Sequence, residues 1–84
     1  PKGKRRNSGP LTPDNGGTGN AEEDFRTLGG GTSEPAPEGA GMPEGSQVAP
    51  NGTRFRPGTE TKGPRIDVPA SGDKPHETLH YPDP

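Results

Sequence analysis

Residues 53–84 read TRFRPGTETKGPRIDVPASGDKPHETLHYPDP, and this stretch decides the fold that we expect. Residues 53–56 and 64–68 each alternate apolar with polar side chains, the period-two pattern typical of a half-buried strand. Residues 76–81 alternate as well and are predicted as a third strand, with a single helical turn as the alternative. Proline and glycine interrupt the chain between these runs. We therefore expect a small twisted antiparallel sheet of about three strands within residues 53–82.

The alternation sorts the side chains of the predicted third strand onto two faces of the sheet. Leu79 and Tyr81 point to an apolar face, which the other strands would extend. His76 and His80, with Thr78 between them, point to the opposite and polar face. The two histidines of the chain are therefore expected on the face where a site can form.

One short helix is expected ahead of the sheet, over residues 20–29. Asn20 can cap its first turn, and Gly29 is a natural place for it to end. Phe25 and Leu28 lie three residues apart and therefore share one face. A helix of about two turns is unstable alone, so this face must dock on another element.

The rest of the composition favours irregular structure. Only 18% of the residues are hydrophobic, and the chain has 15 glycines and 13 prolines, which places it close to the disordered class. The predicted fold class is α+β tending to mostly β, with long irregular Gly/Pro-rich loops. Residues 1–19 are interpreted as a basic linker and residues 20–84 as the functional domain. Because the chain begins with proline, we expect it to be a piece of a longer polypeptide.

Several classes of protein are excluded or made less probable by composition. The chain has no cysteine, which excludes a disulfide framework and a thiolate zinc site. No apolar run has the length of a membrane span, so no stable membrane insertion is expected. The net charge is −2, but the charges are unevenly distributed along the chain. Residues 1–13 form a basic head, residues 14–53 an acidic middle, and residues 54–84 a tail with equal numbers of acids and cations.

The sequence from His76 to His80 matches the H-E-x-x-H pattern of zinc hydrolases. That chemistry needs a helix that stacks the two histidines, with Glu77 as general base. Pro75 and Pro82 leave little room for such a helix. A metal-dependent hydrolase therefore stays a third option, and the favoured interpretation includes no metal and no cofactor.

The favoured interpretation of the same stretch is metal-free cleavage of RNA. That reaction needs a base for the 2′-hydroxyl proton, an acid for the leaving oxygen and cations for the phosphorane charge. His76 is the predicted acid–base residue, with His80 or Glu77 as its partner, and Asp67 or Asp73 would orient an imidazole. The predicted phosphate-binding cations are Arg54, Arg56, Arg65 and Lys74.

Four runs of the chain resemble the C-terminal tips of bacterial polymorphic toxins of the contact-dependent-inhibition, hemagglutinin or Rhs type. These runs are Asp24-Phe-Arg-Thr-Leu-Gly-Gly30, Asn51-Gly-Thr-Arg-Phe-Arg-Pro-Gly58, Gly63-Pro-Arg-Ile-Asp-Val-Pro69 and Lys74-Pro-His-Glu-Thr-Leu-His-Tyr-Pro82. The resemblance implies a secreted or surface-delivered nuclease that acts in the target-cell cytoplasm. It also implies a cognate immunity protein as partner.

Within that class, Asp73-x-x-His76 followed by His80 is similar to the active strand of the ribosomal-RNA-cleaving colicins. In this chain His80 occupies the position that is a glutamate in those toxins. The resemblance implies an endoribonuclease acting on rRNA or tRNA, with the ribosome as a further partner. The alternative is a disordered Pro/Gly-rich interaction segment without catalysis, since the composition alone favours disorder.

Overall fold

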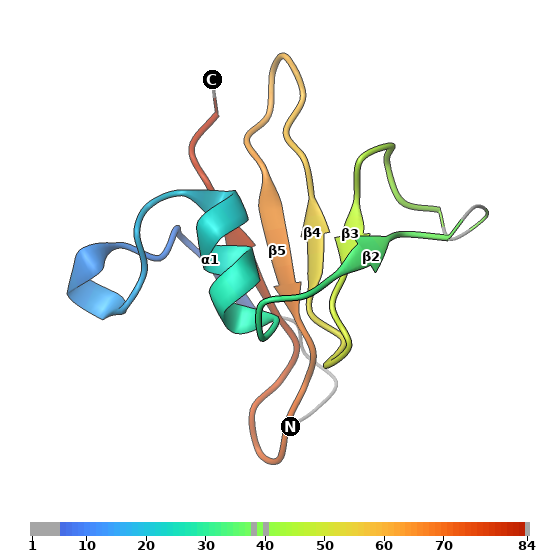
Figure 1. Cartoon of the computed structure of the whole chain (residues 1–84). Coiled ribbons are helices and arrows are strands. Elements are labelled where there is room, and N and C mark those ends of the chain that lie inside the picture. The colour runs from blue at the N-terminus through green and yellow to red at the C-terminus, as the bar shows by residue number, and fades with distance from the viewer. Residues whose placement is uncertain (1–5, 38, 40, 84) are drawn as a thin grey trace.

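A computed structural model describes residues 6–37, 39 and 41–83, and this part of the chain forms one mixed sheet with a helix packed on it (Figure 1). The strand order across the sheet is β1-β6-β5-β4-β3-β2. No helix in the described part of the chain is long and apolar enough to cross a membrane. The elements in chain order are β1 (Arg6–Ser8), a 3-10 turn η1 (Pro13–Asn15), α1 (Ala21–Leu28), β2 (Glu34–Pro35), β3 (Gln47–Val48), β4 (Arg54–Arg56), β5 (Arg65–Val68) and β6 (Glu77–His80).

The prediction of a three-stranded antiparallel sheet with long irregular loops was wrong. The three expected strands are β4, β5 and β6, and they form adjacent antiparallel strands within a six-stranded sheet. β1 adds to β6 in parallel, inside the segment interpreted as a linker, and β2 and β3 come from the expected loop. β1 consists of three polar residues, and β2 and β3 are two residues long, so none of the three shows an alternation of apolar and polar side chains. They form because the backbone groups at the sheet edges need hydrogen-bond partners.

The predicted helix and its ends are confirmed. Asn20 caps α1 by accepting a 3.0 Å hydrogen bond from the N–H of Glu23. Three acidic residues in the first turn stabilise the positive end of the helix dipole. The helix ends at Gly29, whose N–H donates to the carbonyl of Phe25. Gly30 and Gly31 follow with positive φ angles of 85° and 96°, which let the chain turn toward β2.

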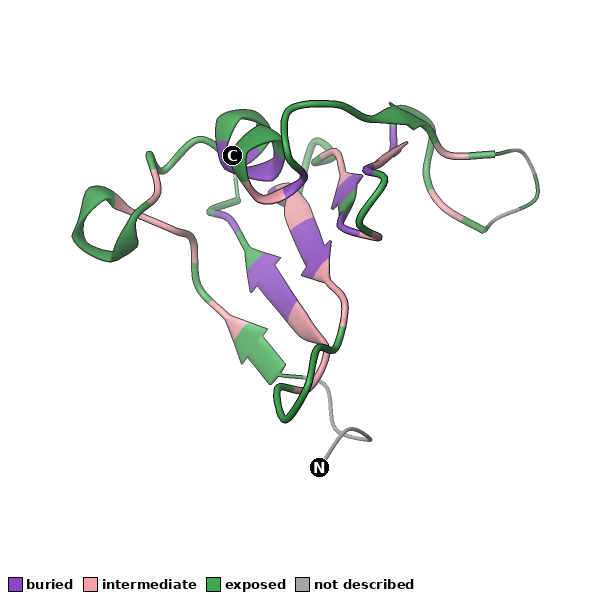
Figure 2. Cartoon of the chain, turned by 60° about the horizontal axis from the view of Figure 1, so that its bottom comes forward, coloured by how far each residue is buried: buried purple, intermediate pink, exposed green. Residues whose placement is uncertain are grey.

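The core lies between α1 and one face of the sheet. Phe55, Ile66 and Leu79 are aligned in register across β4, β5 and β6, and Ile66 is fully buried. Phe25 of α1 packs on Phe55, with ring centroids 5.6 Å apart. Figure 2 shows the buried residues running through the central strands and the inner side of α1. The remaining buried apolar residues are Ala21, Ala49 and Tyr81.

The other face of the sheet is polar, and no described helix covers it (Figure 1). Ile66 and its neighbours point toward α1, so the residues on either side of them in each strand point away from it. The prediction that residues 76–81 include a strand is confirmed by β6, and the alternative of a helical turn is wrong. We call this side the polar face; on the three central strands it carries Arg54, Arg56, Arg65, Asp67, Thr78 and His80.

Candidate functional site

Asp67 lies at the centre of the polar face and is surrounded by hydrogen-bond donors. Its carboxylate is 2.9 and 3.0 Å from Nη2 of Arg56, and it accepts a 2.8 Å hydrogen bond from Oγ1 of Thr78. Nε2 of His76 lies 3.7 Å from Oδ1 of Asp67. We call these four residues the Asp67 cluster. They come from β4, β5, β6 and the position that precedes β6, and all of them meet at the carboxylate of Asp67.

The register of the sheet explains why these four side chains meet. Asp67 is directly opposite Thr78 on β6 and directly opposite Arg54 on β4. Arg56 is two residues beyond Arg54 and reaches Asp67 along the diagonal. Diagonal neighbours on one face are within reach of long side chains. His76 immediately precedes β6 and approaches the same carboxylate from the other diagonal.

Asp67 is held as a carboxylate at neutral pH. Its side chain is only 9% exposed, and this burial by itself would raise the pKa of Asp67. The hydrogen bond from Thr78 and the charge of Arg56 outweigh burial, so the pKa is lowered overall. A buried negative charge beside an imidazole orients the ring and stabilises its protonated form.

His76 is placed to transfer a proton. Its side chain is 34% exposed, yet its Nε2 atom is buried and has no hydrogen-bond partner within the described residues. A small movement would let Nε2–H donate to the carboxylate of Asp67, whose Oδ1 is 3.7 Å away. In that tautomer the lone pair of Nδ1 is free to accept a proton from a bound molecule.

His80 belongs to a different part of the polar face. Its Nε2 lies 3.0 Å from Oδ1 of Asn7 on β1, whereas His76 turns toward β5. Four residues along a strand separate the two Cα atoms by about 13 Å. The two imidazoles therefore turn toward opposite neighbours and do not form one acid–base pair in this structure.

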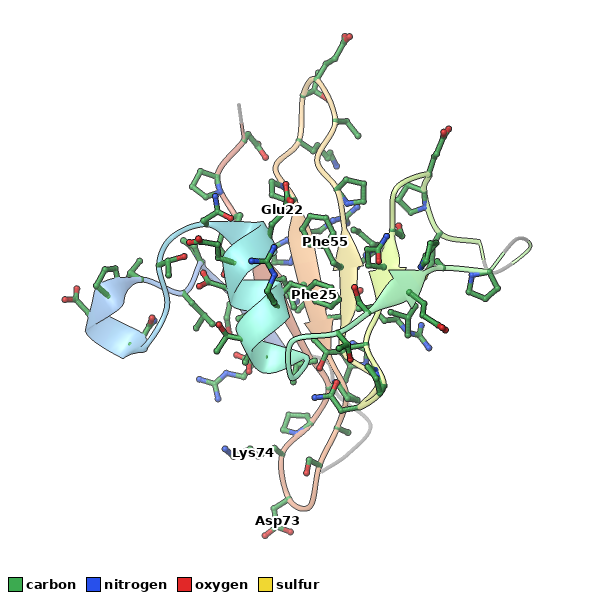
Figure 3. All side chains as sticks on the ribbon, in the orientation of Figure 1. Glu22, Phe25, Phe55, Asp73 and Lys74 are labelled. Atoms are coloured by element: carbon green, nitrogen blue, oxygen red, sulfur yellow. The ribbon has the colours of Figure 1, made fainter. Side chains whose placement is uncertain are left out.

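Glu77, Asp73 and Lys74 lie away from the Asp67 cluster. Glu77 is on the α1 side of the sheet, where it accepts a hydrogen bond from Oγ of Ser8. Asp73 and Lys74 are exposed at the tip of the β5–β6 hairpin, as Figure 3 shows. The structure therefore does not bring these three predicted site residues together with His76.

The strand geometry also bears on the H-E-x-x-H interpretation. Residues 76 and 80 would be about one turn apart in a helix, but here His76 precedes β6, His80 is the last residue of β6, and residue 77 faces the other side of the sheet. The arrangement that makes this motif a zinc site is therefore not formed. Within the described residues there is no group of three or more His, Asp or Glu side chains that could hold a metal ion.

The predicted cations divide between two places. Arg54, Arg56 and Arg65 are on the polar face, whereas Lys74 is at the hairpin tip. Lys2, Lys4 and Arg5, which form the predicted basic head with Arg6, lie outside the described residues. Arg6 is in β1 and lies 3.9 Å from the carboxylate of Glu77.

Sequence reasoning missed the role of Thr78 and Asn7. Thr78 was expected on the polar face, but nothing in the pattern indicated that its hydroxyl would serve Asp67. Asn7 contacts His80 only because β1 pairs with β6 across more than seventy positions of sequence. No local signal in the sequence could have found either contact.

A separate hollow of about 410 Å³ opens on the α1 side of the sheet. Figure 3 labels three of its lining residues, Glu22 on the helix and the core rings Phe25 and Phe55. It contains neither histidine nor a buried carboxylate. The Asp67 cluster is therefore the better equipped of the two places for proton transfer.

Comparison with known proteins adds no assignment. The sequence matches no protein-family profile, and neither the curated proteins nor the solved structures give a significant match. The function proposed for this chain therefore depends on its residues and their geometry.

Proposed function

We propose that this chain is the ribonuclease domain of a bacterial toxin that cleaves rRNA or tRNA by acid–base catalysis without a metal. The observation that supports it best is the contact of 3.7 Å between His76 and the buried carboxylate of Asp67. This pair lies on a face that no described helix covers and that carries three arginines. A proton-transfer group beside cations is what cleavage of a phosphodiester requires.

In the proposed reaction His76 is the general base. Nδ1 takes the proton of the 2′-hydroxyl, and the 2′-oxygen attacks the adjacent phosphorus. The bond from phosphorus to the 5′-oxygen breaks, which leaves a 2′,3′-cyclic phosphate and a free 5′-hydroxyl. The leaving oxygen takes its proton from water, and His76 later returns its own proton to solvent.

The other members of the Asp67 cluster support His76 without reacting. Asp67 orients the imidazole and stabilises its positive charge after proton transfer. Arg56 and Thr78 hold Asp67 ionised and in place. Arg54 is exposed beside the cluster and would bind the phosphate as negative charge grows on it.

The distribution of charge also supports an RNA substrate. The chain as a whole carries a net charge of −2. On the three central strands, however, the polar face carries Arg54, Arg56 and Arg65 against the single carboxylate of Asp67. Glu22 and Glu23 are exposed on α1, on the other side of the sheet. A local excess of cations draws a polyanion to that face.

The proposal includes delivery and a partner. The domain would be part of a larger secreted or surface protein and would act in the cytoplasm of the target cell. A cognate immunity protein would neutralise it, and an acidic partner that covers the polar face would match the cations there. Co-expression with such a partner should allow the toxin to accumulate, whereas expression alone should stop growth.

The test is cleavage of RNA by the purified domain in the presence of EDTA. Labelled tRNA, ribosomes and a single-stranded oligonucleotide should yield discrete fragments that end in 2′,3′-cyclic phosphate. His76→Gln should lower the rate by about 10²-fold or more, the typical contribution of a positioned base. Circular dichroism and urea unfolding of the variant check that it is still folded.

Two results would contradict the proposal. Cleavage by folded His76→Gln at the wild-type rate would remove His76 from the mechanism. A folded wild-type domain that cleaves none of these RNAs would contradict the ribonuclease and leave an interaction role without catalysis, carried by a folded domain and not by the disordered segment of the alternative. Activity that disappears with EDTA would favour the metal-dependent option.

A further inference from the structure

We propose that Lys62, Arg65 and His80 form a second phosphate subsite, which binds the RNA phosphate next to the one that is cleaved. The inference rests on the proposed function and extends it to the path of the substrate. It gives His80 a binding role in place of the catalytic one that the sequence predicted. It also assigns Lys62, which no sequence pattern singled out.

A hollow at the end of β5 and β6 brings these three residues together. It has a volume of about 330 Å³ and is lined by Lys62, Gly63, Arg65, His80, Tyr81 and Asp83. Arg65 and His80 are direct cross-strand neighbours, so their side chains leave the same face side by side. Lys62 comes from the turn that precedes β5, and Figure 1 shows that turn at the same end of the sheet as the segment that follows β6.

The cations of this hollow are available for a ligand. Arg56 is opposite Arg65, but its guanidinium is bound to Asp67. No salt bridge within the described residues engages Lys62 or Arg65. Asp83 is the one carboxylate among the described residues of the lining, and its Oδ1 accepts a 2.7 Å hydrogen bond from the N–H of Gly63. Nε2 of His80 already lies 3.0 Å from Oδ1 of Asn7, so only the other ring nitrogen of His80 could contact a ligand. Among the described lining residues, two full cations stand against one carboxylate, and this balance favours an anion.

The spacing between the two places fits neighbouring phosphates of one strand. Arg65 and Asp67 are two residues apart on β5, on the same face, which places them about 7 Å apart. That distance is of the order that separates successive phosphates in an extended single strand. An RNA chain that runs along β5 and β6 would therefore place one phosphate at the Asp67 cluster and the next in the hollow.

The experiment compares oligonucleotides with one and with two phosphates. The first probe is two deoxynucleosides joined by one phosphate, and the second is three deoxynucleosides joined by two phosphates. Both lack the 2′-hydroxyl and cannot be cleaved. Each is titrated into ¹⁵N-labelled protein at low salt, and the amide signals of Gly63 and Arg65 are followed. The wild type should bind the two-phosphate probe about tenfold more tightly, because charged hydrogen bonds of this kind contribute that much.

Variants identify the residues that produce this gain. In Lys62→Gln/Arg65→Gln the second phosphate should add no affinity, and in Lys62→Gln alone the gain should be partly lost. The matched control is Arg26→Gln, an exposed cation on α1 on the other side of the sheet, which should keep the full gain. Spectra of the free proteins check that each variant is folded.

The results separate the subsite from the proposed function. The subsite would be overturned if the double variant still bound the two-phosphate probe about tenfold more tightly than the one-phosphate probe. It would also be overturned if Arg26→Gln lost as much of this difference in affinity as the double variant. Inorganic phosphate that binds as tightly as the two-phosphate probe would make the hollow a site for free anions and overturn the RNA assignment. A gain that the double variant abolishes, in a protein that cleaves no RNA, would support the subsite and overturn the ribonuclease alone.

Discussion

Oη of Tyr81 donates a 2.6 Å hydrogen bond to Oδ2 of Asp24, and both side chains are buried. The other oxygen of Asp24 accepts from the backbone N–H and the hydroxyl of Thr18, at 2.8 and 3.0 Å. The N–H of Leu11 reaches Oη of Tyr81 at 3.4 Å. One buried carboxylate and one phenol thus join the segment before α1, the helix itself and the chain after β6.

Tyr81→Phe should destabilise the fold. The substitution keeps the ring in the core but leaves Oδ2 of Asp24 buried without its donor, which typically costs about 1–3 kcal/mol. Urea unfolding followed by circular dichroism measures the loss. A change below about 0.5 kcal/mol would show that water replaces the phenol at no cost.

Stability should fall in acid. Burial alone would raise the pKa of Asp24, but hydrogen bonds from Tyr81 and Thr18 lower it overall, and the pKa of Asp67 is lowered as well. A carboxylate with a lowered pKa in the folded state stabilises the fold above its unfolded pKa of about 3.9. That contribution is lost as the pH falls through the lower folded values. The free energy of unfolding should therefore decline below about pH 4, and less steeply in Asp67→Asn.

Stability should also fall in alkali, through Tyr81. Burial and the neighbouring Asp24 raise the pKa of the phenol well above its ordinary value. A raised pKa stabilises the fold fully below the unfolded pKa of about 10, and this contribution is lost as the pH rises toward the folded value. The free energy of unfolding, measured in urea, should decline above about pH 10 in the wild type. Tyr81→Phe should show less of this decline, and an equal decline in both proteins would assign it to other groups.

Gly63→Ala should destabilise the fold far more than Gly9→Ala. A Cβ on Gly63 would overlap the carbonyl oxygens of Tyr81 and Pro82, so the C-terminal segment would have to move away from β5. Overpacking of this kind costs about 1–3 kcal/mol. A Cβ on Gly9 meets nothing within 4 Å, and that variant should stay within about 0.5 kcal/mol of the wild type. Thermal unfolding of both variants measures the two losses of stability. Equal losses would contradict the close approach of Gly63 to the carbonyl oxygens of Tyr81 and Pro82.

Thr78→Val tests the hydroxyl that serves Asp67. Valine keeps the shape of the side chain but removes a donor at a position that is 1% exposed, so a loss of about 1–2 kcal/mol is expected. Thr78→Ser keeps the hydroxyl and removes a methyl group, so it separates the hydrogen bond from packing. Urea unfolding at neutral pH should show Ser retaining the stability that Val loses, and the decline below about pH 4 should be smaller in Val than in Ser. The opposite order would mean that packing, and not the hydroxyl, matters at this position.

The elements that could be predicted are those with local signals. α1 has a capping residue, an acidic first turn and a glycine stop within ten residues, so its ends follow from the sequence. β4, β5 and β6 alternate and are bounded by proline or glycine. β1 is entirely polar, and β2 and β3 have only two residues each, so none of them shows an alternation. They form because β1 pairs with β6, β3 pairs with β4, and β2 pairs with β3.

The candidate site divides in the same way. Alternation was enough to place His76 on the polar face and Leu79 on the apolar one, because a strand has a period of two. It could not show that Arg56 reaches Asp67 along a diagonal, because that depends on the register between β4 and β5. It also could not show that His76 and His80 turn toward different strands.

The sequence by itself determined the short helix, the three central strands and the faces on which their side chains lie, because each depends on residues a few positions apart. Only the tertiary structure decided the six-stranded sheet, the ionised carboxylate beside His76 and the buried contact of Asp24 with Tyr81. Those features join residues up to 73 positions apart. Contacts at such separations depend on strand register and burial, which no local pattern carries.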